Sequence, residues 1–454
     1  MKGLITILGA GESGTGAALL AKAKGYGVFV SDFGTISDHY KGVLIENSID
    51  FEEGKHSLEK ILSSEEVVKS PGISDSLPII KSIEEKGIPV IDEIEFAFRY
   101  CDGKIVAITG TNGKTTTTLL TNHIMKSCGL DVVYAGNIGN SFAKEILNDP
   151  KEWYVLEVSS FQLDHIDQFK PDISVLLNIT PDHLDRYEGS MELYSSAKFR
   201  IIKNADESSV FIHFNDDQIV ADRYSSSPFK GSGLPISLSK KVSQGAYVNA
   251  SGELVFNIEG NTHTLNYDNL NNKFLRGEHN KINLMAALLT TLKAGASWSN
   301  AINSLESFKN ASHRLEFIAE INGVEYINDS KATNLDSFSY ALSSFNRPII
   351  WIAGGIDKGN DYSKVYADVV GKVKGLILLG KDNEKLRSSF GNVVSNIIET
   401  EKIEEAVAFA QSIGEPGDVV LLSPACASFD LFKNYEDRGE RFKRSVLELE
   451  NSVL

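Results

Sequence analysis

The sequence is poor in cysteine, in basic relative to acidic residues, and in long apolar runs, and each shortage excludes a class of protein. Three cysteines in 454 residues (Cys101, Cys128 and Cys426) give neither a disulfide framework nor metal-ligand spacing, which favours reduced thiols in a cytosolic protein. The 45 Lys and Arg against 61 Asp and Glu leave a net charge of −16, which argues against a general nucleic-acid binder. No run approaches the roughly 18 apolar residues of a membrane span. We therefore expect a cytoplasmic protein without nucleic-acid or membrane partners.

What the sequence does contain is a repeated alternation of short apolar strands and helical patterns, which is typical of parallel α/β sheets. The alternation falls into three blocks, approximately 1–95, 96–310 and 311–454. In the first block the pattern predicts strands at Leu4–Leu8 and Val28–Ser31, with a helix at Ala17–Lys24 between them. In the middle block, residues 208–265 are polar and strand-like. The hydrophobic fraction of 42% is ample for the cores of several domains.

A phosphate-binding loop is predicted at Gly110–Thr116. It follows the apolar segment Ile105–Ile108 and precedes a helical pattern. In such a turn, backbone N–H groups at the helix start face phosphates, Lys114 adds a positive charge, and the Thr115 hydroxyl can hold Mg²⁺. The strict P-loop pattern has a Gly where this chain has Ile108. The run alone therefore leaves two interpretations, a nucleoside triphosphate site and an ordinary strand-to-helix turn.

A second glycine-rich turn, with glycines at positions 9, 11 and 14, fits the dinucleotide fingerprint G-x-G-x-x-G. Asp32 follows at the end of the next predicted strand, where a carboxylate can meet a ribose hydroxyl. In physical terms, this pattern provides a site where a helix N-terminus can bind a pyrophosphate. NAD, another nucleotide diphosphate and a purely structural turn all remain open on this pattern alone.

Polar residues also gather where strands of the middle block end, which is where ligands collect in open α/β sheets. Glu157 closes a buried strand and is a candidate Mg²⁺ ligand, although a strand-end Glu can also pair with a lysine. His183 stands among carboxylates after the next strand and can bind a metal as neutral imidazole, although a lone His is more often structural. Asn137, between glycines, is a weak candidate for a substrate contact. Lys198 looks like an ordinary helix lysine.

Taken together and in order, these motifs resemble those of the Mur ligase superfamily, whose members build the cytoplasmic precursor of peptidoglycan. Two pairs of stretches in the third block resemble the branch of that family that adds D-glutamate. The motifs that carry the resemblance are Gly110–Thr116, Gly136–Gly139, Glu157–Ser160, Thr180–Arg186 and Gly277–Asn283, then Ser312–Glu316 with Ile327–Asn334, and Leu422–Asp430 with Asn434–Phe442.

The resemblance implies an ATP-dependent amide ligase that joins D-glutamate to UDP-N-acetylmuramoyl-L-alanine through an acyl phosphate. It implies three α/β domains. The first, residues 1–95, would be Rossmann-like and bind the UDP substrate. The second, residues 96–310, would be a P-loop ATPase-like domain, and the third, residues 311–454, would be Rossmann-like and bind D-glutamate.

The resemblance also implies roles for individual residues. ATP would contact Gly110, Thr111, Asn112, Gly113, Lys114, Thr115, Thr116, Asn283, Arg314, Asp329 and Lys331. Two Mg²⁺ ions would be held, one by Thr115 and Glu157, the other by His183 and by Lys198 as N6-carboxylysine. The UDP substrate would contact Ser13, Asp32, Ser70, Gly72 and Asn137, and D-glutamate would contact Thr333, Lys358, Ser428, Phe429 and Tyr435. The catalytic group would be Lys114, Asn137, Glu157, His183 and Lys198.

The sequence departs from the family pattern at one place, and two competing hypotheses for the function remain. After the strand-end Asp32, relatives often carry Thr-Arg, whereas this chain has Phe33 and Gly34, which leaves the uracil contacts open. A P-loop regulatory module would hydrolyse ATP without any amino-acid acceptor, and an oxidoreductase would bind NAD(P)H. We expect a monomer.

Overall fold

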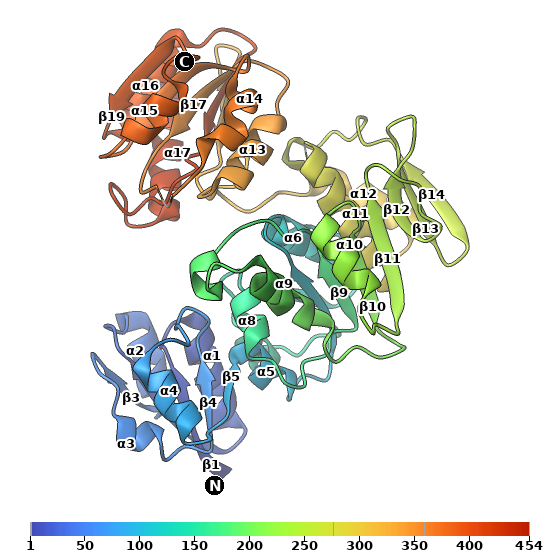
Figure 1. The fold of residues 1–454 in the computed structure, drawn as a ribbon, viewed down its shortest axis with the longest axis vertical. Helices are drawn as coiled ribbons and strands as arrows, with labels where there is room; N and C mark the ends of the chain where they lie inside the picture. Colours follow the sequence, from blue (N-terminus) through green and yellow to red (C-terminus); the bar gives the residue numbers. More distant parts are fainter. Residues whose placement is uncertain (1, 276, 358, 454) are drawn as a thin grey trace. The chain divides into compact units, whose positions relative to one another are not determined.

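The computed structural model describes residues 2–275, 277–357 and 359–453, which form three separate β-sheets (Figure 1). The chain divides into two compact units. The first comprises residues 1–267 and 282–304 and holds two of the sheets, and the second comprises residues 268–281 and 305–454 and holds the third. None of the described helices is long and apolar enough to cross a membrane.

The first sheet has five parallel strands in the order β3-β2-β1-β4-β5. Because β1 lies between β2 and β4, the loops after these three strands meet at one edge, where the glycine-rich turn opens into α1. The strands are β1 (Lys2–Leu8), β2 (Tyr26–Asp32), β3 (Asp50–Glu53), β4 (Glu66–Lys69) and β5 (Val90–Asp92), and the helices are α1 (Glu12–Ala23), α2 (Asp38–Glu46), α3 (Leu58–Ile61), α4 (Pro78–Glu85) and α5 (Glu93–Phe98).

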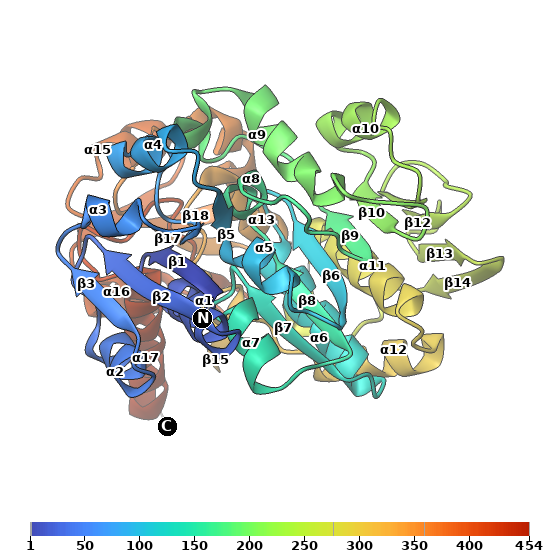
Figure 2. The same ribbon diagram turned by 90° about the horizontal axis from the view of Figure 1, so that it is seen from below.

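The second sheet has nine strands in the order β14-β13-β12-β11-β10-β9-β6-β8-β7, and only the two pairings at its β14 end, β12 with β13 and β13 with β14, are antiparallel. Figure 2 shows β7, β8, β6 and β9 side by side. Strand β8 is buried along its whole length, as expected for a parallel strand covered on both faces. The strands are β6 (Lys104–Thr109), β7 (Val132–Gly136), β8 (Trp153–Glu157), β9 (Ile173–Leu176), β10 (Val210–Phe214), β11 (Ser232–Ser237), β12 (Gly245–Val248), β13 (Leu254–Ile258) and β14 (Asn261–Leu265).

The helices that accompany this sheet begin with α6, which continues directly from the phosphate loop. They are α6 (Lys114–Ser127), α7 (Phe142–Asn148), α8 (Ser160–Asp164), η1 (Leu184–Tyr187), α9 (Met191–Phe199), η2 (Arg200–Ile202), α10 (Gln218–Ser225), α11 (Glu278–Lys293) and α12 (Trp298–Ser304). The short helices η3 (Lys273–Leu275) and η4 (Leu305–Ser307), with the first residues of α11, belong to the second unit.

The third sheet has six strands in the order β15-β16-β20-β17-β18-β19, with only β15 antiparallel to its neighbour. Strands β16, β20 and β17 are adjacent and parallel, so the loops that follow them gather at one edge. The elements are β15 (Glu316–Ile321), β16 (Val324–Asn328), α13 (Leu335–Ser343), β17 (Ile349–Ala353), η5 (Tyr362–Val365), α14 (Tyr366–Val369), β18 (Val373–Leu379), α15 (Glu384–Phe390), β19 (Asn396–Thr400), α16 (Ile403–Ile413), β20 (Val419–Leu422) and α17 (Tyr435–Val453).

Helix α5 ties the first sheet to the second within the first unit through two buried glutamates. Glu93 accepts hydrogen bonds from the Ser141 hydroxyl (2.7 Å) and the Ala143 N–H (2.8 Å), and burial raises its pKa. Glu95, fully buried, accepts from three consecutive N–H groups in residues 167–169 at 2.9, 3.0 and 2.9 Å. One continuous apolar core runs across both sheets. These contacts explain why the two sheets form one compact unit.

We expect Glu95→Ala to lower the free energy of unfolding by about 3 kcal/mol or more, because it leaves three N–H groups and the Arg99 guanidinium without their charged acceptor. Urea unfolding followed by tryptophan fluorescence measures this, since Trp153 and Trp298 report on the first unit. Glu152→Ala is the matched control, since its side chain is exposed and its loss should cost no more than about 0.5 kcal/mol. A loss below about 1 kcal/mol in Glu95→Ala would show that these bonds do not hold the sheets together.

The predicted α/β class is confirmed, but the predicted start of the first helix was wrong. Helix α1 begins at Glu12 rather than Ala17, because Gly14 lets it start directly from the glycine-rich turn; a Cβ at Gly14 would lie 1.9 Å from the Gly9 carbonyl oxygen. The strand-like character predicted for region 208–265 is confirmed by β10–β14, and the same region also contains the helix α10, whose first turn Asp217 caps through a bond to the Val220 N–H. The three predicted domain ranges stay predictions.

Candidate active site

The phosphate loop between β6 and α6 is held in place by the chain that follows β9. Asn178 accepts from the Asn112 N–H (2.8 Å) and donates to the Asn112 carbonyl (3.1 Å), while the Thr111 N–H donates to the Asn178 carbonyl (2.9 Å). Gly113 has φ +87° and caps α6 without a side-chain hydrogen bond. The loop is thus fixed and the helix N-terminus carries no side-chain cap, which suits an anion.

Asn283, predicted to contact ATP, lies at this same turn. A Cβ on Gly113 would approach the Asn283 Oδ1 to 2.4 Å, and Thr117 donates to that oxygen at 3.2 Å. Only glycine fits at position 113, both for its left-handed conformation and for this close approach.

Two lysine ammonium groups meet at one carbonyl of the phosphate loop. Lys114 and Lys198 each donate to the Gly110 carbonyl oxygen at 2.8 Å, and Lys114 also donates to the Thr111 carbonyl at 2.8 Å. Lys198 is only 2% exposed, so it is not the ordinary surface lysine that its helical pattern suggests. Burial, followed by the charge of Lys114, lowers the pKa of Lys198 well below its usual range. Burial therefore shifts the protonation equilibrium of Lys198 toward the neutral amine.

Glu157 and Asn137 form a pair at the carboxyl end of β8. The Asn137 amide donates to one carboxylate oxygen of Glu157 at 3.0 Å. The other oxygen, Oε2, is buried and has no hydrogen-bond partner among the described residues. A buried carboxylate oxygen left in this way is costly unless a cation binds it. Glu157 thus fits the predicted role of a metal ligand, as does the buried hydroxyl-bearing residue Thr115 at the start of α6.

His183 lies on the loop before η1 and is half exposed. Its Nε2 is 3.6 Å from a carboxylate oxygen of Asp182, and its ring packs against Phe161. Thr180, on the same loop, donates its N–H to the Thr111 hydroxyl at 3.0 Å, which joins this loop to the phosphate loop. Within the described residues, no three His, Cys, Asp or Glu side chains cluster as a metal site. A metal here would need a mixed set of ligands, such as the predicted hydroxyl, carboxylate, imidazole and carboxylated lysine.

At the carboxyl edge of the first sheet, the predicted UDP-binding residues surround the start of α1. Asp32 accepts from the N–H groups of Ala10 (2.7 Å) and Gly34 (2.8 Å), so its carboxylate holds the turn closed. The Ser13 hydroxyl donates to Glu93 at 3.3 Å. The Ser70 Oγ is buried without a hydrogen-bond partner among the described residues, and a Cβ on Gly9 would approach it to 2.6 Å. Gly72 faces open space, and Gly11 caps α1 without a side-chain bond.

The remaining predicted residues lie in the second unit. Asp329 accepts from the Ser423 hydroxyl (2.9 Å) and the Leu315 N–H (3.2 Å), and burial raises its pKa to about 7. Beside it in sequence, Lys331 places its ammonium 5.4 Å from the ring centre of Tyr435. Residues Arg314 and Thr333 are half-buried, Ser428 is buried and Phe429 is 67% exposed. Lys358 lies outside the described residues.

These residues share the carboxyl edge of the third sheet, because Asp329–Thr333 follow β16 and Ser428 and Phe429 follow the adjacent β20. Sequence reasoning missed Asn178, Ser423 and Arg438, all of which organise loops through hydrogen bonds to distant segments. Two of the quoted motifs contain missed residues, since Ser423 lies in Leu422–Asp430 and Arg438 lies in Asn434–Phe442.

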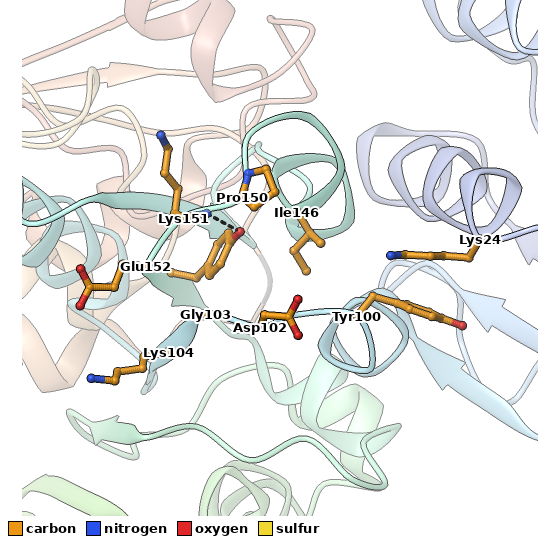
Figure 3. Close-up of a pocket in the computed structure, with 10 residues that line it drawn as sticks. Lys24, Tyr100, Asp102, Gly103, Lys104, Ile146, Pro150, Lys151 and Glu152 are labelled. Atoms are coloured by element: carbon orange, nitrogen blue, oxygen red, sulfur yellow. Dashed lines mark hydrogen bonds between the residues drawn. The ribbon is translucent and has the colours of Figure 1, made fainter.

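A cavity of about 330 Å³ in the first unit is separate from the phosphate loop of that unit (Figure 3). Lys24, Tyr100, Asp102 and Tyr154 contribute to its walls, and the Tyr154 hydroxyl oxygen accepts the Lys151 N–H at 2.9 Å. It lies where β6 and β8 begin, at the opposite end of these strands from the phosphate loop. None of the predicted site residues lines it.

The fold and site together define a nucleotide-binding α/β protein with three sheets. Three family models match it in succession: MurD N-terminal domain over residues 4–77, Mur ligase middle domain over 108–291, and Mur ligase, glutamate ligase domain over 313–426. The chain belongs to the Mur ligase family, which confirms the predicted resemblance.

Curated relatives agree with this assignment, and a solved structure agrees with the fold. The chain is 51% identical over 447 residues to a UDP-N-acetylmuramoylalanine–D-glutamate ligase of Cytophaga hutchinsonii, covering 98% of this chain and 99% of the relative. It is 48% identical over 455 residues to the ligase of that name from Porphyromonas gingivalis, covering 98% of each. Among solved structures, UDP-N-acetylmuramate-alanine ligase MurC from Thermotoga maritima matches with a TM-score of 0.62 at 19% identity over 99% of this chain and 100% of that chain, which supports the fold.

Proposed function

We propose that this protein is an ATP-dependent ligase that joins D-glutamate to UDP-N-acetylmuramoyl-L-alanine in the synthesis of peptidoglycan precursors. The observation that carries the proposal is the near-complete match to D-glutamate ligases, at 45–51% identity in several relatives. The phosphate loop with its two lysines provides the matching chemistry. We further propose that the protein acts as a monomer in the cytoplasm.

The chemistry requires activation, because a carboxylate is a poor electrophile for an amine. Transfer of the γ-phosphoryl group of ATP to the alanyl carboxylate makes an acyl phosphate, and the D-glutamate amine then displaces phosphate. The γ-phosphoryl group and the carboxylate are both anions, so cations must lie where they meet. Lys114 supplies one such charge from the phosphate loop. Asn137 orients the Glu157 carboxylate.

Two Mg²⁺ ions fit the available donors, and when bound they neutralise phosphate charge and orient the transferring group. Thr115 and Glu157 would hold the first. His183 and Lys198 would hold the second, with Lys198 as N6-carboxylysine. Its burial beside Lys114 supports this proposal, because a neutral amine is the form that captures CO₂. Carboxylation turns the side chain into an anionic oxygen ligand suited to a hard ion.

The three substrates are assigned to the carboxyl edges of the three sheets. The UDP substrate would contact the α1 N-terminus with Ser13, Asp32, Ser70 and Gly72, and it would reach Asn137 in the second sheet. ATP would contact the phosphate loop and Asn283, and the roles of Arg314, Asp329 and Lys331 toward ATP stay predictions. D-glutamate would contact Thr333, Lys358, Ser428, Phe429 and Tyr435.

We expect D-glutamate to be used and L-glutamate to be used poorly or not at all. A pocket that holds both carboxylates leaves the amine in one position, and inverting the α-carbon moves that amine away from the acyl carbon. Phosphate release with UDP-N-acetylmuramoyl-L-alanine, ATP and each amino acid measures this. Equal rates with both enantiomers would contradict the assignment of the third sheet.

The phosphate-release assay, together with a fluorescence measurement of NAD(P)H binding, separates the competing functions. A regulatory ATPase would release phosphate at the same rate without any amino acid. An oxidoreductase would bind NAD(P)H, whose fluorescence reports binding directly. A ligase releases phosphate only when both the UDP substrate and the acceptor are present.

A further inference from the structure

Arg438 is a buried cation in the first turn of α17 that has no assigned role in the reaction. Its side chain is only 2% exposed. Among the described residues it forms no ion pair, since its partners are one hydroxyl and three backbone carbonyl groups. Burial lowers the pKa of Arg438 to about 10, which leaves the guanidinium charged at neutral pH. Its charge is therefore retained inside the protein without a directly bound carboxylate.

The guanidinium fork joins three loops at the carboxyl edge of the third sheet. Nε donates to the Ser330 hydroxyl (3.0 Å) and Nη2 to the Ser330 carbonyl (2.8 Å). Nη1 donates to the carbonyls of Gly354 and Cys426, each at 3.3 Å, and Nη2 also reaches Cys426 at 3.3 Å. Ser330 follows β16, Gly354 follows β17 and Cys426 follows β20, and these three strands are adjacent in the sheet.

The loop after β17 packs closely against the end of β18 and against the loop after β20. A Cβ on Gly354 would lie 2.4 Å from the Leu379 carbonyl oxygen, and one on Gly355 would lie 2.1 Å from that of Ala427. Ile356 and Ala427 exchange backbone hydrogen bonds of 2.8 and 3.1 Å. The positions of the loops therefore depend on backbone hydrogen bonds, several of which end on Arg438.

Stability alone does not explain an arginine at this position. A buried charge loses its hydration, and apolar side chains of similar volume are often as stable or more stable in such places. The two carboxylates whose charges act on Arg438, those of Asp329 and Asp430, are not hydrogen-bonded to it. A fixed positive charge in a low-dielectric interior instead favours an anion that binds nearby.

We propose that Arg438 is a positioning residue of the acceptor site, which fixes the three loops around D-glutamate and adds a buried positive charge that attracts its carboxylates. This inference rests on the proposed function, because the same loops carry the residues assigned to D-glutamate. These are Thr333 after β16 and Ser428 and Phe429 after β20. Arg438 lies behind these loops and does not itself contact the substrate.

The test is steady-state kinetics of the full-length chain with Arg438→Lys and Arg438→Met. Lysine keeps the charge but loses the planar fork, whereas methionine loses both. We expect the KM for D-glutamate to rise about tenfold in Arg438→Lys and about a hundredfold in Arg438→Met, since bonds to a charged group are lost. The KM for the UDP substrate should change by less than about twofold, because it is assigned to another sheet. A purely structural role would not separate the two constants.

Arg441→Ala is the matched control, since Arg441 lies one turn further along α17, half exposed and paired with Asp437. It should leave all constants within about twofold. If Arg438→Met does not fold, the KM values of Arg438→Lys test the inference. An unchanged KM for D-glutamate in folded Arg438→Lys would overturn the inference, as would an equal rise for every substrate. A wild-type protein that does not use D-glutamate would instead overturn the proposed function, and this inference with it.

Discussion

Lys114→Ala is expected to lower turnover by about a thousandfold or more, because it removes a cation from the place where phosphoryl charge develops. In the structure the Lys114 ammonium lies over the phosphate loop, 2.8 Å from the carbonyl oxygens of Gly110 and Thr111. Bound phosphate competes with these carbonyls for the ammonium. The alanine variant keeps the backbone N–H groups of the loop but not the charge that moves with the transferring group. The loss should therefore appear in kcat more than in the KM for ATP.

Phosphate release under saturating substrates measures this effect. Lys126→Ala is the matched control, because Lys126 is an exposed residue in the last turn of the same helix, α6. It should retain turnover within about twofold. Calorimetric binding of the UDP substrate should be unchanged in Lys114→Ala, since that site is assigned to the first sheet. Near-normal turnover in Lys114→Ala would contradict the assignment of the phosphate loop.

The parts of the site that the sequence predicts are those encoded locally. The run Gly110–Thr116 contains the turn, the lysine and the helix start in consecutive residues, although Asn178 from the segment after β9 holds the loop in place. The turn at Gly9–Gly14 is likewise written in consecutive residues, and Gly14 is needed for its close approach to the Gly9 carbonyl, whereas Gly9 itself approaches the distant Ser70. Fold class was predictable for a related reason, because strand and helix periodicities are local.

The parts that the sequence does not predict depend on contacts between distant segments. Lys198 reads as a surface lysine on its helix, and its burial arises only because α9 packs over a loop 88 residues earlier in the chain. Arg438 bonds to Ser330 and Gly354, which lie 108 and 84 residues away. No periodicity of α9 or α17 encodes these partners. Only the family resemblance marked Lys198, and it assigned no role to Arg438.

Lys198→Ala is expected to abolish most turnover, by about a thousandfold, while leaving the fold intact, since alanine is favourable in a helix. If Lys198 is carboxylated, this variant removes an anionic metal ligand rather than a cation. Added formate or acetate should then restore part of the activity by occupying the vacated position. The same anions should not restore Lys114→Ala, where a positive charge is missing. This opposite response separates the two lysines, although both bond to one carbonyl.

Phosphate release with and without formate measures the rescue, and circular dichroism checks the fold. Lys203→Ala is the matched control, since Lys203 lies five residues further along, and its side chain is 39% exposed. It should retain turnover and show no response to formate. Intact-mass measurement of an active, CO₂-equilibrated sample tests the modification itself. An unmodified Lys198 in such a sample, or full activity in Lys198→Ala, would refute carboxylation, and His183 with water would then have to hold the second metal.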